Sequence, residues 1–230
     1  MVPVSGNNLQ ANPTPGASSV SQQFSNIFMV PPTTTGNETV VVQATMSNAN
    51  GRTFTGATYG GQTMTEVYQQ NRSGLSQRMV CYALNQAPTG SNTLTITFNG
   101  NQFNPISIAI KSFGDCGGVG NTLRTGAQNT PHNGILTIQD ESFVMMTSCS
   151  VNQILTQQIP TGSNRFFSQH NTNRQVAAGA LGAPTATGFP AGDLDLQATS
   201  TFGTLTLDRV EIKGLSTAPL NEGNFFKLFI

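Results

Sequence analysis

The sequence predicts an all-β protein, an antiparallel β-sandwich with jelly-roll or Greek-key connections. Three observations predict it: segments in which apolar and polar residues alternate, turn signals between them at short intervals, and no helical pattern longer than two turns. Because the chain has 230 residues, it is long enough for one sizeable β core. We therefore expect a single sandwich domain over residues 27–230.

Residues 1–26 differ from the remainder of the chain. They are rich in Asn, Gln, Ser, Pro and Gly, carry no charge and show no apolar periodicity. A segment with so few apolar side chains does not fold alone. We therefore expect an extended N-terminal arm, held either by its own domain or by a neighbour.

The clearest strands lie in TLTITFNGNQFNPISIAIKSF, Thr93 to Phe113. Apolar residues of one parity alternate there with Thr, Ser, Ala and Lys, a period of two that is typical of strands. We expect two antiparallel strands, joined by a loop that holds Asn99-Gly100 and Pro105. The residues expected in the core are Leu94, Ile96, Phe98, Ile106, Ile108 and Ile110.

The other expected strands follow from similar runs of β-branched and alternating residues. They are Thr39–Ser47, Thr53–Tyr59, Met64–Gln69, Gln77–Leu84, Ile135–Gln139, Ser142–Ser148, Ile154–Ile159, Arg165–Gln169, Leu194–Thr199, Thr204–Ile212 and the apolar C-terminal Phe225–Phe229. The expected turns are Asn50-Gly51, Gly60-Gly61, Pro88-Thr89-Gly90, Asn133-Gly134 and Pro160-Thr161-Gly162.

The composition is polar but scarcely charged. Charged residues make up 9% of the chain, and the net charge is zero, so it has no basic surface for nucleic acid or an anionic membrane. No apolar run is long enough to span a membrane, and the N-terminus MVPVSGNNLQ lacks the features of a secretory signal. We expect a soluble chain made in a cytoplasm, with no nucleic-acid or membrane partner. The three cysteines, Cys81, Cys116 and Cys149, are expected to be free thiols without a complete disulfide framework.

Several segments resemble a known β-sandwich module of phage virion structural proteins and bacterial surface proteins. These are ATYGGQTMTEVYQQ (57–70), RMVCYALNQAPTGSNTLTITF (78–98) and ISIAIKSFGD (106–115), with NGILTI, ESFVMMTSCSV, AGDLDLQAT and TLTLDRVEIKGL resembling its second half. The resemblance covers residues 37–214. It implies structural roles for Gly60, Gly61, Pro88 and Gly90 in turns, and no catalytic set. Tyr82 stands where the module often has Trp, and this chain has no Trp at all.

The residues offer weak candidates for catalysis. Cys149 with His132 or His170 and Asp140 is the best nucleophilic set that can be assembled. Adjacent Asp140 and Glu141 would diverge on a strand, which argues against a glycosidase pair. We expect no enzyme activity and no cofactor.

Two further segments are candidate ligand sites. Asp193 and Asp195 share a strand face and could hold Ca²⁺, although solvent-exposed acids explain them as well. The Gly-rich GDCGGVGN (114–121) lacks the Lys and the helix of a phosphate-binding loop, so we expect an ordinary loop there. We expect no metal site in the chain.

The function is therefore expected to lie on surfaces. Strands of Thr, Ser and Asn with almost no charge suit a protein that packs against identical copies. We expect a non-enzymatic bacteriophage virion protein, a capsid decoration, cement or spike component. It would be a homo-oligomer in contact with the major capsid protein, located in the virion and assembled in the host cytoplasm. The alternative is a receptor- or glycan-binding module of a tail fibre or adhesin, with contacts from Tyr59–Gln62, Asn99–Asn104 and Phe166–Asn173.

Overall fold

The computed structural model is an antiparallel all-β structure, as the sequence predicts. It describes residues 9–11, 19–30, 37–46, 52–72, 77–102, 106–129, 135–150, 155–158, 170–172, 175–177, 189–195, 197–200 and 204–215. Of the expected features, the strands Arg165–Gln169 and Phe225–Phe229 and the turns at Asn50, Asn133 and Pro160 lie outside these residues. In the described part of the chain, no helix is long and apolar enough to cross a membrane.

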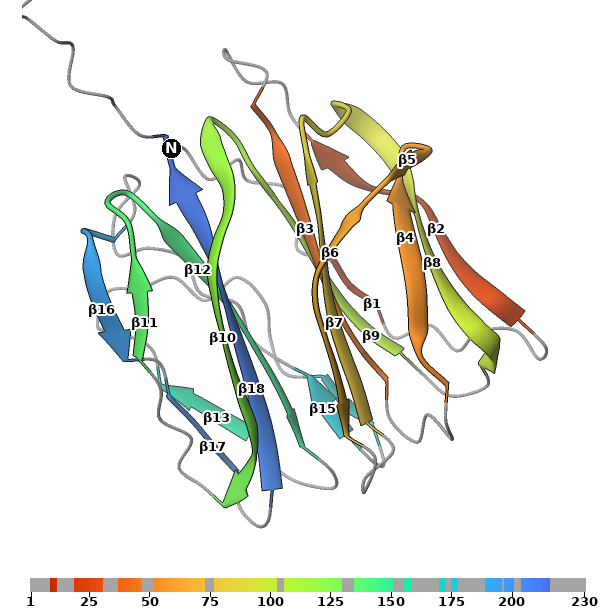
Figure 1. Ribbon diagram of the computed structural model, residues 1–230. Coiled ribbons are helices and arrows are strands. Elements are labelled where there is room, and N and C mark those ends of the chain that lie inside the picture. Colours follow the sequence, from red (N-terminus) through yellow and green to blue (C-terminus); the bar gives the residue numbers. More distant parts are fainter. Residues whose placement is uncertain are drawn as a thin grey trace, which may run out of the picture.

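Three larger sheets are stacked on one another (Figure 1). Sheet A has the order β2 (Ser19–Val30), β8 (Gly90–Gln102), β4 (Phe54–Tyr59), β5 (Gln62–Thr63). Sheet B has the order β1 (Leu9–Ala11), β9 (Ile106–Phe113), β3 (Thr39–Met46), β7 (Gln77–Asn85), β6 (Thr65–Arg72). Sheet C has the order β10 (Cys116–Asn129), β18 (Thr204–Gly214), β12 (Phe143–Ser150), β15 (Gln175–Ala177), β14 (His170–Thr172).

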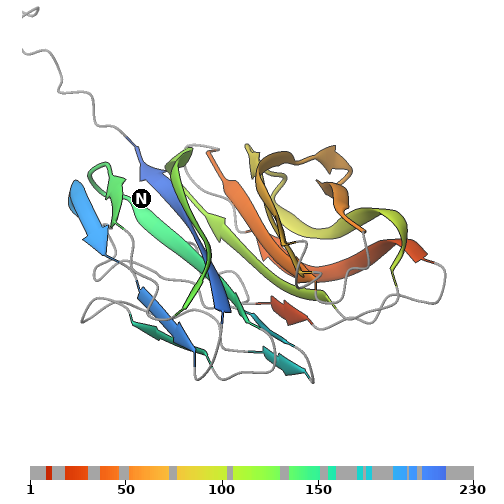
Figure 2. The same ribbon diagram turned by 60° about the horizontal axis from the view of Figure 1, so that its bottom comes forward.

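Two small sheets complete the described fold. β11 (Ile135–Ile138) pairs with β16 (Gly192–Asp195), and β13 (Leu155–Gln158) pairs with β17 (Gln197–Ser200). Both lie beyond sheet C, on the side away from sheet B (Figure 2). Leu136 and Ile138 of β11 are buried in the same apolar cluster as Val144 of β12. Sheet C, like sheet B, is therefore covered on both faces.

Sheet B is the central layer. Every residue of β3, TVVVQATM, is buried. Its even-numbered residues belong to the apolar cluster shared with sheet A, whereas Val41 belongs to the cluster shared with sheet C. This arrangement explains the unbroken run Val40-Val41-Val42, because a strand that is buried on both faces has no need of alternation.

The core predicted from the alternating pair of runs is confirmed. Leu94, Ile96, Phe98, Ile106, Ile108 and Ile110 are all at most 5% exposed. The expected pairing of the two runs is wrong, however, since β8 lies in sheet A and β9 in sheet B. Their apolar faces meet across the A–B core instead of their edges meeting in one sheet. Asn99-Gly100 accordingly lies within β8 and does not form the expected turn.

The described parts of the expected arm belong to the chain's own sheets. β1 pairs with β9, and β2 pairs with β8. Phe24 is buried in the A–B core. The expected boundary between residues 26 and 27 thus falls inside β2.

Two turns form as predicted. Gly60 and Gly61 have φ of 58° and 78°, and a Cβ on Gly60 would lie 2.6 Å from Pro88 Cγ. Gly90 has φ of 81°, and the Asn92 amide donates to the carbonyls of residues 88, 89 and 90. Both turns need glycine because L side chains rarely adopt positive φ.

Candidate functional site

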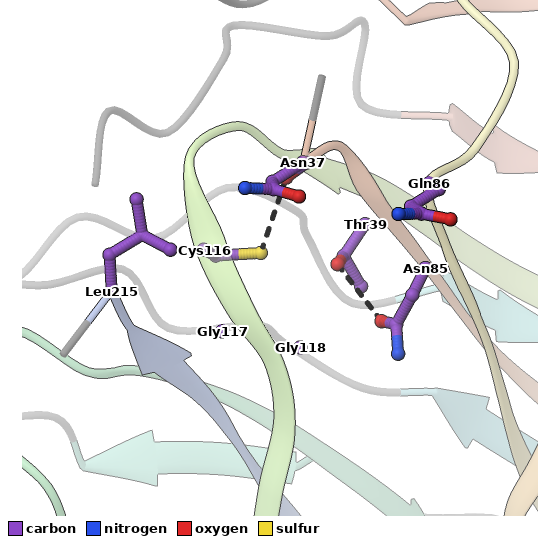
Figure 3. Close-up of a pocket in the computed structure, with 8 residues that line it drawn as sticks. All are labelled: Asn37, Thr39, Asn85, Gln86, Cys116, Gly117, Gly118 and Leu215. Carbon is purple, nitrogen blue, oxygen red and sulfur yellow. Dashed lines mark hydrogen bonds between the residues drawn. The ribbon is translucent and has the colours of Figure 1, made fainter. Parts of the chain in front are cut away.

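A pocket opens where sheet B meets the start of β10 (Figure 3). Its volume is about 330 Å³, near the lower limit for small-molecule sites. Side chains from the beginning of β3 and the end of β7 form one wall, and the beginning of β10 forms the other. The lining residues are Asn37, Thr39, Asn85, Gln86, Cys116, Gly117, Gly118 and Leu215.

The pocket wall is polar and uncharged. The Thr39 hydroxyl donates a 3.0 Å hydrogen bond to Asn85 Oδ1, which orients the amide. The backbone N–H of Cys116 donates to the carbonyl of Asn37 at 3.5 Å, and the thiol lies 3.9 Å from the same oxygen. Amides and a hydroxyl can both donate and accept, so the pocket suits a small neutral ligand with hydroxyl or amide groups.

Glycines shape this wall. Gly118 has φ of 78°, and a Cβ there would lie 3.0 Å from Asn85 Oδ1. A Cβ on Gly117 would lie 2.9 Å from the carbonyl oxygen of Gly214. The stretch GDCGGVGN, predicted as a loop, is therefore mostly the first part of an edge strand with two register shifts. The loop prediction was wrong because glycine within a strand also permits bulges and close backbone approach.

A second polar cluster is closed to solvent, between sheets B and C. Gln43, Cys81 and Tyr68 lie in one cross-strand row of sheet B, and Gln43 Nε2 donates to the Tyr68 hydroxyl at 3.3 Å. Asp208 of β18 faces this row and is fully buried. We call these four residues the inter-sheet cluster.

Burial in the inter-sheet cluster disfavours the ionised forms of Asp208, Tyr68 and Cys81. Burial raises the pKa of Asp208 to about 7, although Arg124 and Arg209 act in the opposite direction. Burial and then the Asp208 carboxylate raise the pKa of both Tyr68 and Cys81 well above their ordinary values. Both Asp208 carboxylate oxygens and Gln43 Oε1 lack a hydrogen-bond partner among the described residues. The Cys81 thiol is thus protonated and enclosed, which makes it a poor nucleophile.

The structure does not assemble the catalytic set considered from the sequence. His132 lies outside the described residues. His170 and Cys149 occupy one row of sheet C, but β15 separates them, a spacing of about 10 Å between backbones. Asp140 and Glu141 form the turn between β11 and β12, where Glu141 has φ of 57°. The turn lies between the two expected strands, Ile135–Gln139 and Ser142–Ser148, so the argument that the two acids would diverge on a strand does not apply to them.

Asp193 lies exposed in β16 and accepts a 2.6 Å hydrogen bond from the Thr137 hydroxyl. Its expected companion Asp195 occupies the same strand, two residues further on. Among the residues that the structure describes, no three His, Cys, Asp or Glu side chains are grouped so as to hold a metal ion.

The three segments predicted for receptor contact differ in their exposure to solvent. Tyr59 is fully buried, which removes it from any contact surface, whereas Gly60, Gly61 and Gln62 are exposed. Asn99 is exposed, and its Oδ1 accepts a 2.9 Å hydrogen bond from the backbone N–H of Thr53, the residue before β4. Only 170–172 of the third segment lie within the described residues.

The outward side of sheet A carries a continuous polar surface, which we call the hydroxyl face. One row across the sheet runs Gln23, Thr95, Thr58, Thr63. The Thr55 hydroxyl donates to the Thr97 hydroxyl at 3.1 Å in the next row. The members, all partly or fully exposed, are Ser21, Gln23, Thr55, Thr58, Thr63, Thr93, Thr95 and Thr97.

Sequence reasoning found the threonine parity of the hydroxyl face but missed the pocket and the inter-sheet cluster. The Gly-rich stretch at 114–121 was the only local signal of the pocket. The inter-sheet cluster had none, because its members come from four strands and Asp208 lies far along the chain from the other three. Comparisons with protein-family models, with curated proteins and with solved structures give no match for this chain.

Proposed function

We propose that this chain is a non-enzymatic structural protein of a bacteriophage virion, a decoration, cement or spike component of the capsid. The hydroxyl face is the observation that carries the proposal. Its eight members are uncharged and lie on sheet A, one of the two outer sheets of the three-sheet stack. Hydroxyl and amide groups can pair across a contact, and an uncharged face brings no like-charge repulsion when many copies crowd together. The resemblance of residues 37–214 to virion modules gives the biological setting.

In this proposal the chain forms homo-oligomers, contacts the major capsid protein and joins the particle in the host cytoplasm. The direct test is electron microscopy of virions labelled with antibody against the chain. Labelled heads are the expected result. Virions without label would contradict the proposal.

A second experiment tests the hydroxyl face itself. The double variant Thr95→Lys/Thr97→Lys places two charges at its centre, and we expect it to lose rebinding to particles stripped of the protein. Gln139→Lys is the control, since Gln139 is exposed and directly follows β11, a strand that lies beyond sheet C and away from sheet A (Figure 1). Equal rebinding by both variants would show that attachment uses another surface.

The pocket supports a second candidate function, a receptor- or glycan-binding module of a tail fibre or adhesin. Its uncharged amides suit the hydroxyls of a sugar, although no aromatic residue lines it for stacking. Antibody label on tails instead of heads would favour this candidate.

A further inference from the structure

Four side-chain oxygens in and beside the inter-sheet cluster have no hydrogen-bond partner among the described residues. They are Asp208 Oδ1 and Oδ2, Gln43 Oε1 and Thr147 Oγ1. Asp208 is 0% exposed, and both Gln43 and Thr147 are 2% exposed. Bulk solvent therefore does not satisfy these oxygens, and each one costs free energy unless something fills its lone pairs.

The four oxygens gather near the Tyr68 hydroxyl, between sheets B and C. Asp208 and Thr147 are direct partners in sheet C, on the face that carries Val210 into the apolar cluster shared with sheet B. Burial is the main cause of the raised Tyr68 pKa, and Asp208 raises it further. Gln43 and Thr147 act on this pKa in the opposite direction, although Thr147 Oγ1 lacks the geometry of a hydrogen bond. All three side chains thus lie close to one hydroxyl group.

In the described part of the chain, no cationic side chain hydrogen-bonds to the Asp208 carboxylate. Arg209 follows Asp208 in β18, so it belongs to the opposite face of sheet C. Arg124 pairs with Asp208 across β10, but it is exposed, and its Nη1 donates to the carbonyl of Gln69 at 3.4 Å. Buried charges in proteins are paired or coordinate metals. The ionised carboxylate therefore needs a positive charge in direct contact.

We propose that the inter-sheet cluster, together with Thr147, binds one monovalent alkali cation, Na⁺ or K⁺. The ligands are the oxygens of Asp208, Gln43 and Thr147, and hard cations prefer oxygen ligands of this kind. Asp208 is the single acid of the cluster, so one positive charge leaves the site neutral. Water could fill the same lone pairs, but it would leave the carboxylate uncompensated. This site goes beyond the proposed function and does not depend on it.

The bound cation links two sheets. Gln43 belongs to β3 of sheet B, whereas Asp208 and Thr147 belong to β18 and β12 of sheet C. A ligand that binds only the folded chain stabilises it by mass action, so Na⁺ or K⁺ should stabilise the stack beyond the general effect of salt. In a buffer without alkali cations, burial governs the carboxylate and raises the pKa of Asp208 to about 7.

Thermal melts in chloride salts of equal ionic strength test the inference, at about pH 8.5, where the carboxylate is ionised. Relative to tetramethylammonium chloride, NaCl or KCl at about 100 mM should raise the melting temperature by about 3 °C or more. Asp208→Asn should lose this cation-specific shift. Asp193→Asn is the matched control, since Asp193 is an exposed acid on β16, and it should keep the shift. Equal wild-type melting temperatures in the three salts would overturn the inference and leave a proton as the compensating charge.

A second measurement detects the ion without unfolding the protein. NMR relaxation of the ion that gives the larger shift, with Tl⁺ standing in for K⁺, should show binding to the wild type and none to Asp208→Asn. Thr147→Val removes a hydroxyl that has no hydrogen-bond partner, so it should fold, and it should bind the ion about tenfold more weakly. Relaxation that is the same for the wild type and both folded variants would refute the site. Virion labelling is unaffected by either outcome.

Discussion

The Ser142 hydroxyl donates a 2.7 Å hydrogen bond to Oε1 of Glu211, a residue 69 positions later in the chain. The same carboxylate accepts from the backbone N–H groups of Gln139 and Asn121 at 2.7 and 2.8 Å. Glu211 is 1% exposed. One buried carboxylate of β18 therefore fixes the beginning of β12, the end of β11 and the bulged part of β10.

Replacing Glu211 by Gln should lower the free energy of unfolding by about 1–3 kcal/mol, because an amide nitrogen cannot accept one of these three bonds. Ser142→Ala, which removes one donor only, should cost less. Denaturant titration of both variants gives the comparison. A Glu211→Gln protein as stable as the wild type would show that the three bonds contribute nothing net.

Substitution of Gly120 should destabilise the protein, because any side chain there would meet the Glu211 carboxylate. A Cβ on Gly120 would collide with Glu211 Oε2, whereas nothing lies within 4 Å of a Cβ on Gly100. Gly120→Ala should therefore displace the carboxylate and lower the melting temperature. Gly100→Ala, also within a strand, should leave the melting temperature unchanged or slightly raised. Similar effects of the two substitutions would contradict the placement of Glu211.

Asp208 should make the protein less stable as the pH rises. Burial raises its pKa from 3.8 to about 7 in the folded state, so its stabilising contribution is complete below pH 3.8 and is lost as the pH rises through 7. A shift of this size corresponds to about 4 kcal/mol. Asp208→Asn cannot ionise, so the variant should gain stability relative to the wild type between pH 4 and 8.

The measurement for Asp208 is the difference in free energy of unfolding between Asp208→Asn and wild type at several pH values. Other titrating groups cancel in this difference. A difference that stays constant with pH would mean that Asp208 ionises normally in the folded protein.

Phe24 should contribute to the core although it lies in the segment predicted as an arm. Phe24→Ala should destabilise the fold by about 3–5 kcal/mol, the usual cost of truncating a buried aromatic residue. Ser25→Ala is the control, since Ser25 is exposed. Thermal melts at low protein concentration keep association out of the comparison. Equal melting temperatures for the two variants would mean that β2 does not hold the core.

The thiols of Cys81 and Cys116 should react at different rates. Cys116 lines the pocket, whereas Cys81 is fully buried and its pKa is raised well above the ordinary value. A thiol reagent followed by peptide mapping should therefore label Cys116 first in the folded protein. Both should react at similar rates in denaturant. Faster labelling of Cys81 in the folded state would contradict the enclosed inter-sheet cluster.

Local sequence patterns were enough to predict the fold class and many strands. The strand Ile106–Phe113 has the predicted bounds, and the Gly60-Gly61 turn forms where it was expected. Both depend on neighbouring residues: alternation requires a pleated strand, and paired glycines permit positive φ. The missed strand β10 begins with glycines at 117, 118 and 120, which weaken every local strand signal.

Alternation shows which residues share a face of a strand but not what covers that face. In β18, Arg209 and Glu211 share a face opposite Val210 and Ile212, a pattern typical of a strand with one side in water. Both charged residues are buried nevertheless. For Glu211 the reason is that the β11–β16 pair covers the outer side of sheet C there. The sequence by itself thus determined the all-β class, the buried parity of β8 and β9 and the glycine turns. Only the tertiary structure decided which strands pair and which polar residues are enclosed, because these depend on contacts between segments far apart in the chain.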